Sequence, residues 1–126
     1  MSWIWTQQAG ELWWNGKLIS KGYAGKGRGK NNPALQAVKG IGPIPQGIWK
    51  MVGVKDSPNT GRFTISLVAQ DGNQDDIHQP TGRSAFRVHG DSIKNPGTAS
   101  RGCIVLPRGI REKMWYSGDR VIEVRG

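Results

Sequence analysis

Short apolar stretches alternate with turn residues along the whole chain. In residues 62–69, Phe63, Ile65 and Leu67 occupy every second position, which is the period of a strand with one buried face. Similar short runs, bounded by glycine, proline or polar residues, predict further strands. These strands are predicted over residues 3–7, 11–14, 48–54, 85–89 and 120–124.

Glycine and proline separate these runs. Asn15-Gly16 lies between two apolar pairs and predicts a two-residue hairpin turn. Residues 22–32 form a glycine-rich basic loop, and residues 33–38 predict one helical turn. The prolines and glycines of residues 40–47 exclude regular structure there, and residues 71–82 are polar and rich in turn formers.

One segment carries the signals of a helix. Pro107 suits the first helical turn and Gly118 suits a helix end, so a helix is predicted over about 107–117. The chain of 126 residues is long enough for one modest core. The expected fold is therefore a single domain over 1–126. It is mainly β, a β-sandwich or a related β-rich fold, with one helix in the C-terminal half.

The composition supports the β-rich prediction and shows that the chain is strongly basic. The 19 glycines argue against a helix bundle, and burial is the default expectation for each of the six tryptophans. The net charge is +9, with Lys and Arg scattered from Lys17 to Arg125. Such a charge fits a solvated basic surface. It also fits a polyanionic partner such as nucleic acid, anionic lipid or an acidic cell-wall polymer.

The sequence also bears on location. Residues 1–6 contain neither a basic leader nor a long apolar run, and no stretch approaches the roughly 20 apolar residues of a membrane span. The chain is expected to be made in the cytoplasm without a signal peptide and to stay there unless another system exports or releases it. With one cysteine, no internal disulfide can form.

That cysteine and a histidine form the candidate chemical site. His89 ends a predicted strand, and Cys103 follows a glycine and opens an apolar segment. A nucleophilic thiol needs a base, which His89 can supply, and donors for an oxyanion, which the backbone N–H groups of Gly102 and Cys103 can supply. The Gly90 carbonyl or the Asp91 carboxylate could orient the imidazole. The alternative is an inert buried cysteine beside Ile104.

A family resemblance arises at these residues. His89-Gly90 followed by Ser100-Arg101-Gly102-Cys103-Ile104 resembles the signature of the L,D-transpeptidase catalytic domain. The stretches Tyr23 to Pro33 and Gly42-Pro43-Ile44-Pro45-Gln46-Gly47 are similar to motifs of a small branch, the type VI secretion L,D-transpeptidase effectors. Related domains resemble phage and prophage lysis enzymes.

The resemblance implies an activity and a substrate. It implies acyl transfer on peptidoglycan stem peptides of the meso-diaminopimelate type, through a thioester, as an L,D-carboxypeptidase or L,D-transpeptidase. Cys103 would be the nucleophile and His89 the general base. Gly90 would orient the imidazole through its carbonyl, and Gly102 with Cys103 would form the oxyanion hole. The protein would be an antibacterial effector or a phage endolysin.

Two features depart from the family pattern. Arg101 stands where many members have a second histidine, and its fork of donors suits a substrate carboxylate. The loop between His89 and Cys103 is shorter than in the larger transpeptidases. An open site follows, which favours hydrolysis because water can reach the thioester.

Other residues are candidates for the substrate groove. The resemblance makes Tyr23, Lys30, Asn31 and Asn32 walls of that groove, whereas Asx-type hydrogen bonds from the two asparagines would make the same segment a structural turn. Asp91 is placed either beside His89 or in an ordinary turn. Ser100 is expected in the turn before Cys103 and in the substrate-binding set, but not as a nucleophile.

Two alternatives involve other chemistry. A metal site of His78, His89, Cys103 and an aspartate lacks the usual ligand spacings, so neither metal nor cofactor is expected, and His78 is interpreted as a surface histidine in a polar loop. The glycine-rich segment 25–30 could instead belong to a basic single-stranded nucleic-acid-binding β domain with a structural cysteine.

The enzyme interpretation also predicts partners. These are stem peptides and a cognate immunity protein or a delivery apparatus, with no nucleic acid and no membrane span, for a monomer. The protein would act in the periplasm or cell wall after delivery by a secretion system or release through a phage-made membrane hole.

Overall fold

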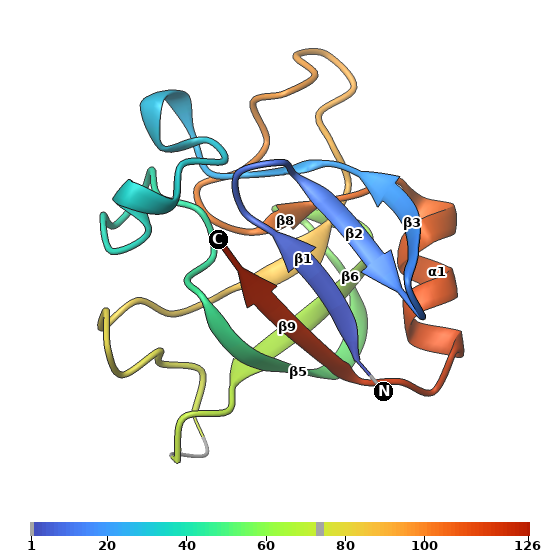
Figure 1. The fold of residues 1–126 in the computed structure, drawn as a ribbon. Helices are drawn as coiled ribbons and strands as arrows, with labels where there is room; N and C mark the ends of the chain where they lie inside the picture. Colours follow the sequence, from blue (N-terminus) through green and yellow to red (C-terminus); the bar gives the residue numbers. More distant parts are fainter. Residues whose placement is uncertain (1, 73–74) are drawn as a thin grey trace.

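The computed structural model describes residues 2–72 and 75–126, which form a mainly β domain with one α-helix (Figure 1). The predicted β-rich class is confirmed, and the strands form one mixed sheet in the order β3-β2-β1-β9-β5-β6-β7-β8-β4. The strands are β1 (Trp3–Thr6), β2 (Glu11–Trp14), β3 (Lys17–Lys21), β4 (Tyr23–Ala24), β5 (Gly47–Ser57), β6 (Gly61–Ala69), β7 (Arg87–His89), β8 (Ile104–Val105) and β9 (Val121–Arg125).

The N-terminal strands form an antiparallel meander with the predicted hairpin turn. Asn15 and Gly16 have φ values of 52° and 76°, the left-handed pair that a two-residue turn between twisted strands requires. The meander joins the rest of the sheet through β1, which pairs in parallel with β9. The first and last strands of the chain therefore lie side by side in the sheet (Figure 1).

The core lies on one face of the curled sheet. Trp3, Trp5 and Trp49 are fully buried, which confirms the default expectation for these three. Trp3 also stacks on Trp14, with ring centroids 4.6 Å apart. The α1 helix, Arg108–Tyr116, covers part of this core and ends before Gly118, as the sequence predicts.

Two short 3-10 turns lie in the segment before β5. Gly27–Gly29 lies within the glycine-rich loop, and Pro33–Leu35 confirms the predicted helical turn. The glycine-rich loop also contains β4, which the sequence did not predict. Two residues carry no strand periodicity, and β4 exists because it pairs with β8.

The interpretation of His78 as a surface residue is wrong. An isolated bridge to Arg83 turns the segment back over the core, and only 7% of His78 remains exposed. Its ring stacks on Trp49 at 5.5 Å and its Nδ1 lies 2.8 Å from Thr81 Oγ1. Residues 73–74 of the predicted polar segment lie outside the described residues.

Within the described ranges, no helix is long and apolar enough to cross a bilayer.

Candidate active site

Parallel pairing of β7 with β8 brings the predicted cysteine and histidine together. Val88 pairs with Ile104 and His89 with Val105, so one residue earlier Cys103 lies beside Arg87. A hydrogen bond from the Arg87 N–H to Cys103 Sγ at 3.3 Å agrees with this register. Cys103, which directly precedes β8, and His89, which ends β7, therefore lie on neighbouring segments of the sheet, two residues out of register.

His89 is held as a base would need to be. The residue is only 4% exposed, and its Nδ1 lies 2.8 Å from the Gly90 carbonyl oxygen. An Nδ1–H donated to that oxygen leaves Nε2 with its lone pair. Burial lowers the pKa of His89 below its ordinary 6.5, and the hydrogen bond to Gly90 opposes this shift. The cations of Arg111 and Arg87 lower the pKa further, and Asp91 raises it. The neutral ring is therefore favoured at pH 7.

The buried Arg111 contributes to this environment from α1. Its guanidinium donates to the carbonyl oxygens of Leu106, Phe63 and Arg62, which ties the helix to β6 and to the end of β8. A Cβ on Gly90 would approach that guanidinium to 3.1 Å, so the cation packs directly against the residue after His89. Sequence reasoning missed Arg111, since an arginine in a helix ordinarily faces solvent.

Cys103 is half-buried, and its thiol faces backbone groups. Sγ accepts from the Arg87 N–H and lies 3.7 Å from the Ala85 carbonyl oxygen, which is also 3.3 Å from Arg87 Nη1. Burial raises the pKa of the thiol above its ordinary value, while the Arg87 N–H and the cations of Arg87 and Arg83 oppose that rise. The resting sulfur is thus a thiol, and its proton has to be removed during any attack.

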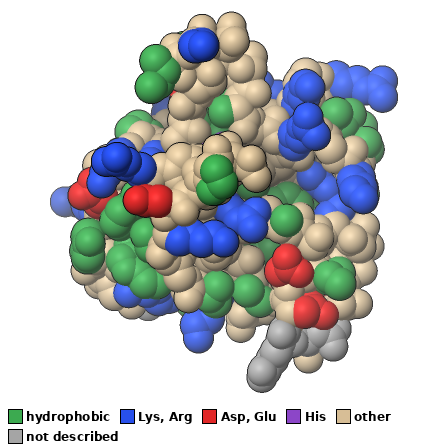
Figure 2. Space-filling view, turned by 180° about the vertical axis from the view of Figure 1, so that it is seen from behind, with side chains coloured by type: hydrophobic (Ala, Val, Ile, Leu, Met, Phe, Trp, Pro, Cys, Tyr) green, Lys and Arg blue, Asp and Glu red, His purple; other side chains and the backbone are tan. Residues whose placement is uncertain are grey.

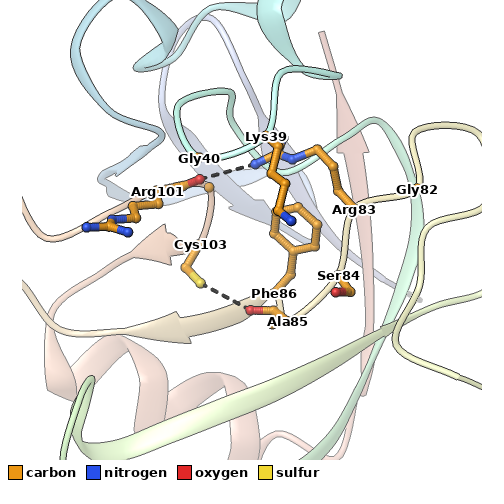
Figure 3. Close-up of a pocket in the computed structure, with 10 residues that line it drawn as sticks. Lys39, Gly40, Gly82, Arg83, Ser84, Ala85, Phe86, Arg101 and Cys103 are labelled. Carbon is orange, nitrogen blue, oxygen red and sulfur yellow. Dashed lines mark hydrogen bonds between the residues drawn. The ribbon is translucent and has the colours of Figure 1, made fainter.

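No hydrogen bond joins Cys103 to His89 in the described ranges, and the two side chains line separate cavities. Cys103 lines a cavity of about 310 Å³ together with residues 82–86 and Lys39 (Figure 3). His89 lines another, of about 540 Å³, with residues 59–61 and the 91–99 loop.

A tight turn sets the position of Cys103. The buried Ser100 hydroxyl donates to the Cys103 carbonyl oxygen at 2.6 Å and accepts from the N–H groups of Gly102 and Gly25. Gly102 has φ 148°, and a Cβ there would lie 2.6 Å from Arg83 Nη2. Only glycine fits this position. The predicted Ser100 turn is present, and its hydroxyl and the Gly102 N–H are occupied by bonds within it.

Arg83 is a second residue that sequence reasoning missed. It is 6% exposed and donates to four carbonyl oxygens, at 2.6 Å to Gln36, 2.9 Å to Gly42 and Pro43, and 3.1 Å to Arg101. Its guanidinium also lies over the Phe86 ring. Arg83 therefore ties the cysteine turn to the segment before β5. No sequence motif marks it, because its acceptors are backbone atoms distant in the chain.

Replacing Arg83 by glutamine is expected to lower the free energy of unfolding by about 2–4 kcal/mol, since several buried carbonyl groups lose their donors. Urea denaturation measures the change. Arg101→Gln is the matched control because that side chain is exposed, and it should unfold like the wild type. Equal stability of the two variants would show that the four hydrogen bonds of Arg83 add nothing to the free energy of unfolding.

The predicted groove residues Tyr23, Lys30 and Asp91 form a network that fixes the 91–99 loop. Tyr23 Oη donates to Asp91 Oδ1 at 2.6 Å and accepts from the Ala99 N–H, and Lys30 Nζ lies 4.4 Å from the centre of the Tyr23 ring. Asp91 also accepts from the N–H groups of Ser92 and Gly97. Its carboxylate is thus engaged in the turn, while Gly90 holds the imidazole.

Tyr23→Phe is expected to loosen this loop. Burial and the Asp91 hydrogen bond raise the pKa of Tyr23 to about 12, so the hydroxyl stays protonated and bonded at neutral pH. Its loss should cost about 1–2 kcal/mol. Hydrogen exchange of the 91–99 amides should accelerate, while exchange in the β2–β3 hairpin stays unchanged. Unaltered exchange in the loop would contradict the anchoring role.

Asn31 and Asn32 make Asx-type hydrogen bonds. Asn31 Oδ1 accepts from the Ala24 N–H at 3.0 Å, and Asn32 Oδ1 accepts from the Ala34 N–H at the start of the second 3-10 turn. These bonds agree with the structural alternative for this segment. Among the residues that the structure describes, no cluster of His, Cys, Asp or Glu could hold a metal ion.

The charge is spread over the surface. One face of the molecule carries many Lys and Arg side chains and few acidic ones (Figure 2). The net charge of +9 therefore belongs to the folded surface and not to a tail.

Comparisons with known proteins give one family. The model described as the Tlde1 domain matches residues 19–123, a range that contains His89, Cys103 and all the predicted substrate-binding residues. No curated protein and no solved structure matches the chain.

Proposed function

Because this chain belongs to the Tlde1 domain family, the L,D-transpeptidase effectors of type VI secretion, we propose that it is a cysteine enzyme that cleaves or exchanges peptidoglycan stem peptides. Family membership by itself assigns it to the peptidoglycan-modifying antibacterial effectors. The observation that supports the chemistry is the parallel pairing of β7, which ends at His89, with β8, which Cys103 directly precedes.

The proposed reaction begins with transfer of the thiol proton to His89 Nε2. The thiol leaves its 3.7 Å contact with the Ala85 carbonyl, turns toward the imidazole and attacks the carbonyl carbon of the L,D peptide bond, on its diaminopimelate side. His89 then returns the proton to the departing amine as the C–N bond breaks. The D-amino acid is released, and the rest of the stem peptide stays on Cys103 as a thioester. Water or an amine from a second stem completes the cycle.

Backbone donors would stabilise the oxyanion of each tetrahedral intermediate. The Cys103 N–H is the first of these donors. The Gly102 N–H is the second, and it has to exchange its 3.0 Å bond to Ser100 Oγ for the oxyanion. The short 91–99 loop leaves water access to the thioester, so hydrolysis is the favoured outcome over transfer.

The partners follow from the family. A cognate immunity protein would protect the producing cell, and a type VI apparatus would deliver the enzyme to the periplasm of a target cell. A monomer is sufficient, because the two proposed catalytic side chains come from one chain.

Mass spectrometry of purified disaccharide-tetrapeptides after incubation with the wild-type protein tests the proposal. Loss of the terminal D-alanine indicates carboxypeptidase activity, and its replacement by an added D-amino acid indicates exchange. Cleavage of cross-linked dimers indicates endopeptidase activity. The proposed function would be rejected if tetrapeptides, tetrapeptides with an added D-amino acid and cross-linked dimers all remained unchanged.

A further inference from the structure

The residues that line the cavity beside Cys103 are positively charged, and acyl transfer by a thiol and an imidazole does not by itself require this charge. The described residues lining it include the cations Lys39, Arg83 and Arg101 and no acidic residue. Resting on the function proposed above, we propose that this cavity binds a carboxylate of the acyl donor, with Lys39 as the main specificity-determining residue and Arg101 at the rim.

The three cations are not equivalent. Arg83 is buried, and its guanidinium is occupied by four carbonyl oxygens, so it supplies positive potential but no free donor. Lys39 and Arg101 are exposed, and neither has an acidic partner within the described ranges. Figure 3 shows the Lys39 side chain running beside Phe86 among the lining residues, whereas the Arg101 side chain points away from them. Lys39 is thus the cation best placed to meet a ligand in this cavity.

The side of the thiol on which this cavity lies decides which part of the substrate enters it. The leaving amine must lie near His89, because the imidazole gives it a proton. His89 lines the other cavity, together with neutral polar residues and one residue of each charge, Asp91 and Lys94, and Cys103 does not line it. The cavity beside Cys103 is therefore left for the acyl half of the substrate.

The acyl half of such a stem peptide is anionic. It carries a free carboxylate on the side chain of diaminopimelate and another on the glutamate that precedes it, and a charge-assisted hydrogen bond to Lys39 would select either. The leaving D-amino acid carries its own carboxylate on the far side of the scissile bond. Amidation removes the charge of one donor carboxylate without changing the scissile bond, so it isolates this contact.

The test compares the unmodified tetrapeptide with two variants, one amidated at diaminopimelate and one at glutamate. For the wild type, one of these amidations is expected to raise KM about tenfold with little change in kcat. Lys39→Gln should raise KM for the unmodified substrate by a similar factor and abolish the discrimination. The amidation that acts identifies which carboxylate is bound.

Lys17→Gln is the matched control, since it removes the same charge from exposed β3 and should keep wild-type discrimination. The inference is overturned if neither amidation changes KM, or if Lys39→Gln discriminates like Lys17→Gln. Calorimetry of the three peptides with Cys103→Ala tests the carboxylate site separately from the proposed enzyme activity, because binding needs no turnover. Weaker binding of one amidated peptide there supports the carboxylate site even if the wild type leaves every muropeptide unchanged.

Discussion

Cys103→Ala is expected to abolish turnover of muropeptides and to leave the fold intact. Without Sγ no thioester can form, and removal of a catalytic nucleophile costs at least about 10⁴-fold in rate. Stability should change little, because the side chain is half-buried and its hydrogen bonds, to a backbone N–H and a carbonyl, are weak ones. Product analysis by mass spectrometry and a thermal melt measure the two effects.

The control for this variant is His78→Gln. It is expected to lose stability, because His78 is buried against Trp49, while retaining the nucleophile, so it should keep measurable turnover well below its melting temperature. Cys103→Ala should show the reverse pattern, with a wild-type melt and no thioester adduct in the intact mass. An alanine variant that still processes tetrapeptide stems would remove Cys103 from the mechanism.

His89→Ala is expected to lower kcat/KM by roughly 10²–10⁴-fold, the usual effect of losing a general base. Because Cys103 is a thiol at rest with a raised pKa, the reaction depends on a base within reach of the sulfur. His78→Gln is the matched control, since His78 is the other histidine and is also buried. It should reduce stability without a comparable loss of activity. Equal losses in both variants would contradict a specific role for His89.

The pH profile gives a separate measurement of the same residue. Burial lowers the pKa of His89 below 6.5, with Arg111 and Arg87 acting in the same direction and Asp91 and the Gly90 carbonyl opposing. The acid limb of kcat/KM should therefore lie below pH 6.5. The stability from keeping this ring neutral is present above the unfolded value of 6.5 and is lost as the pH falls through the folded pKa. An acid limb above pH 7 would contradict the neutral buried base.

Local signals in the sequence predicted much of the fold. The Asn15-Gly16 turn, the helix between Pro107 and Gly118 and the alternation in β6 all depend on neighbours within a few residues. Where an element depends on a distant partner, prediction failed. Tyr23–Ala24 is a strand only because β8 lies beside it, and His78 is buried only because its segment folds back over Trp49.

The sequence by itself determined which chemical groups are present: one thiol, a histidine before a glycine, an excess of cations and turn residues that impose short strands. Only the tertiary structure decided that the segments carrying Cys103 and His89 lie side by side, because the parallel β7–β8 pairing joins strands whose intervening loop has no periodicity. The structure also decided which cations have hydrogen-bond partners. Arg83 and Arg111 donate to backbone carbonyls, whereas Lys39 and Arg101, which line the cavity beside Cys103, have no acidic partner in the described ranges. Such pairings depend on contacts between segments distant in the chain, which local propensity does not encode.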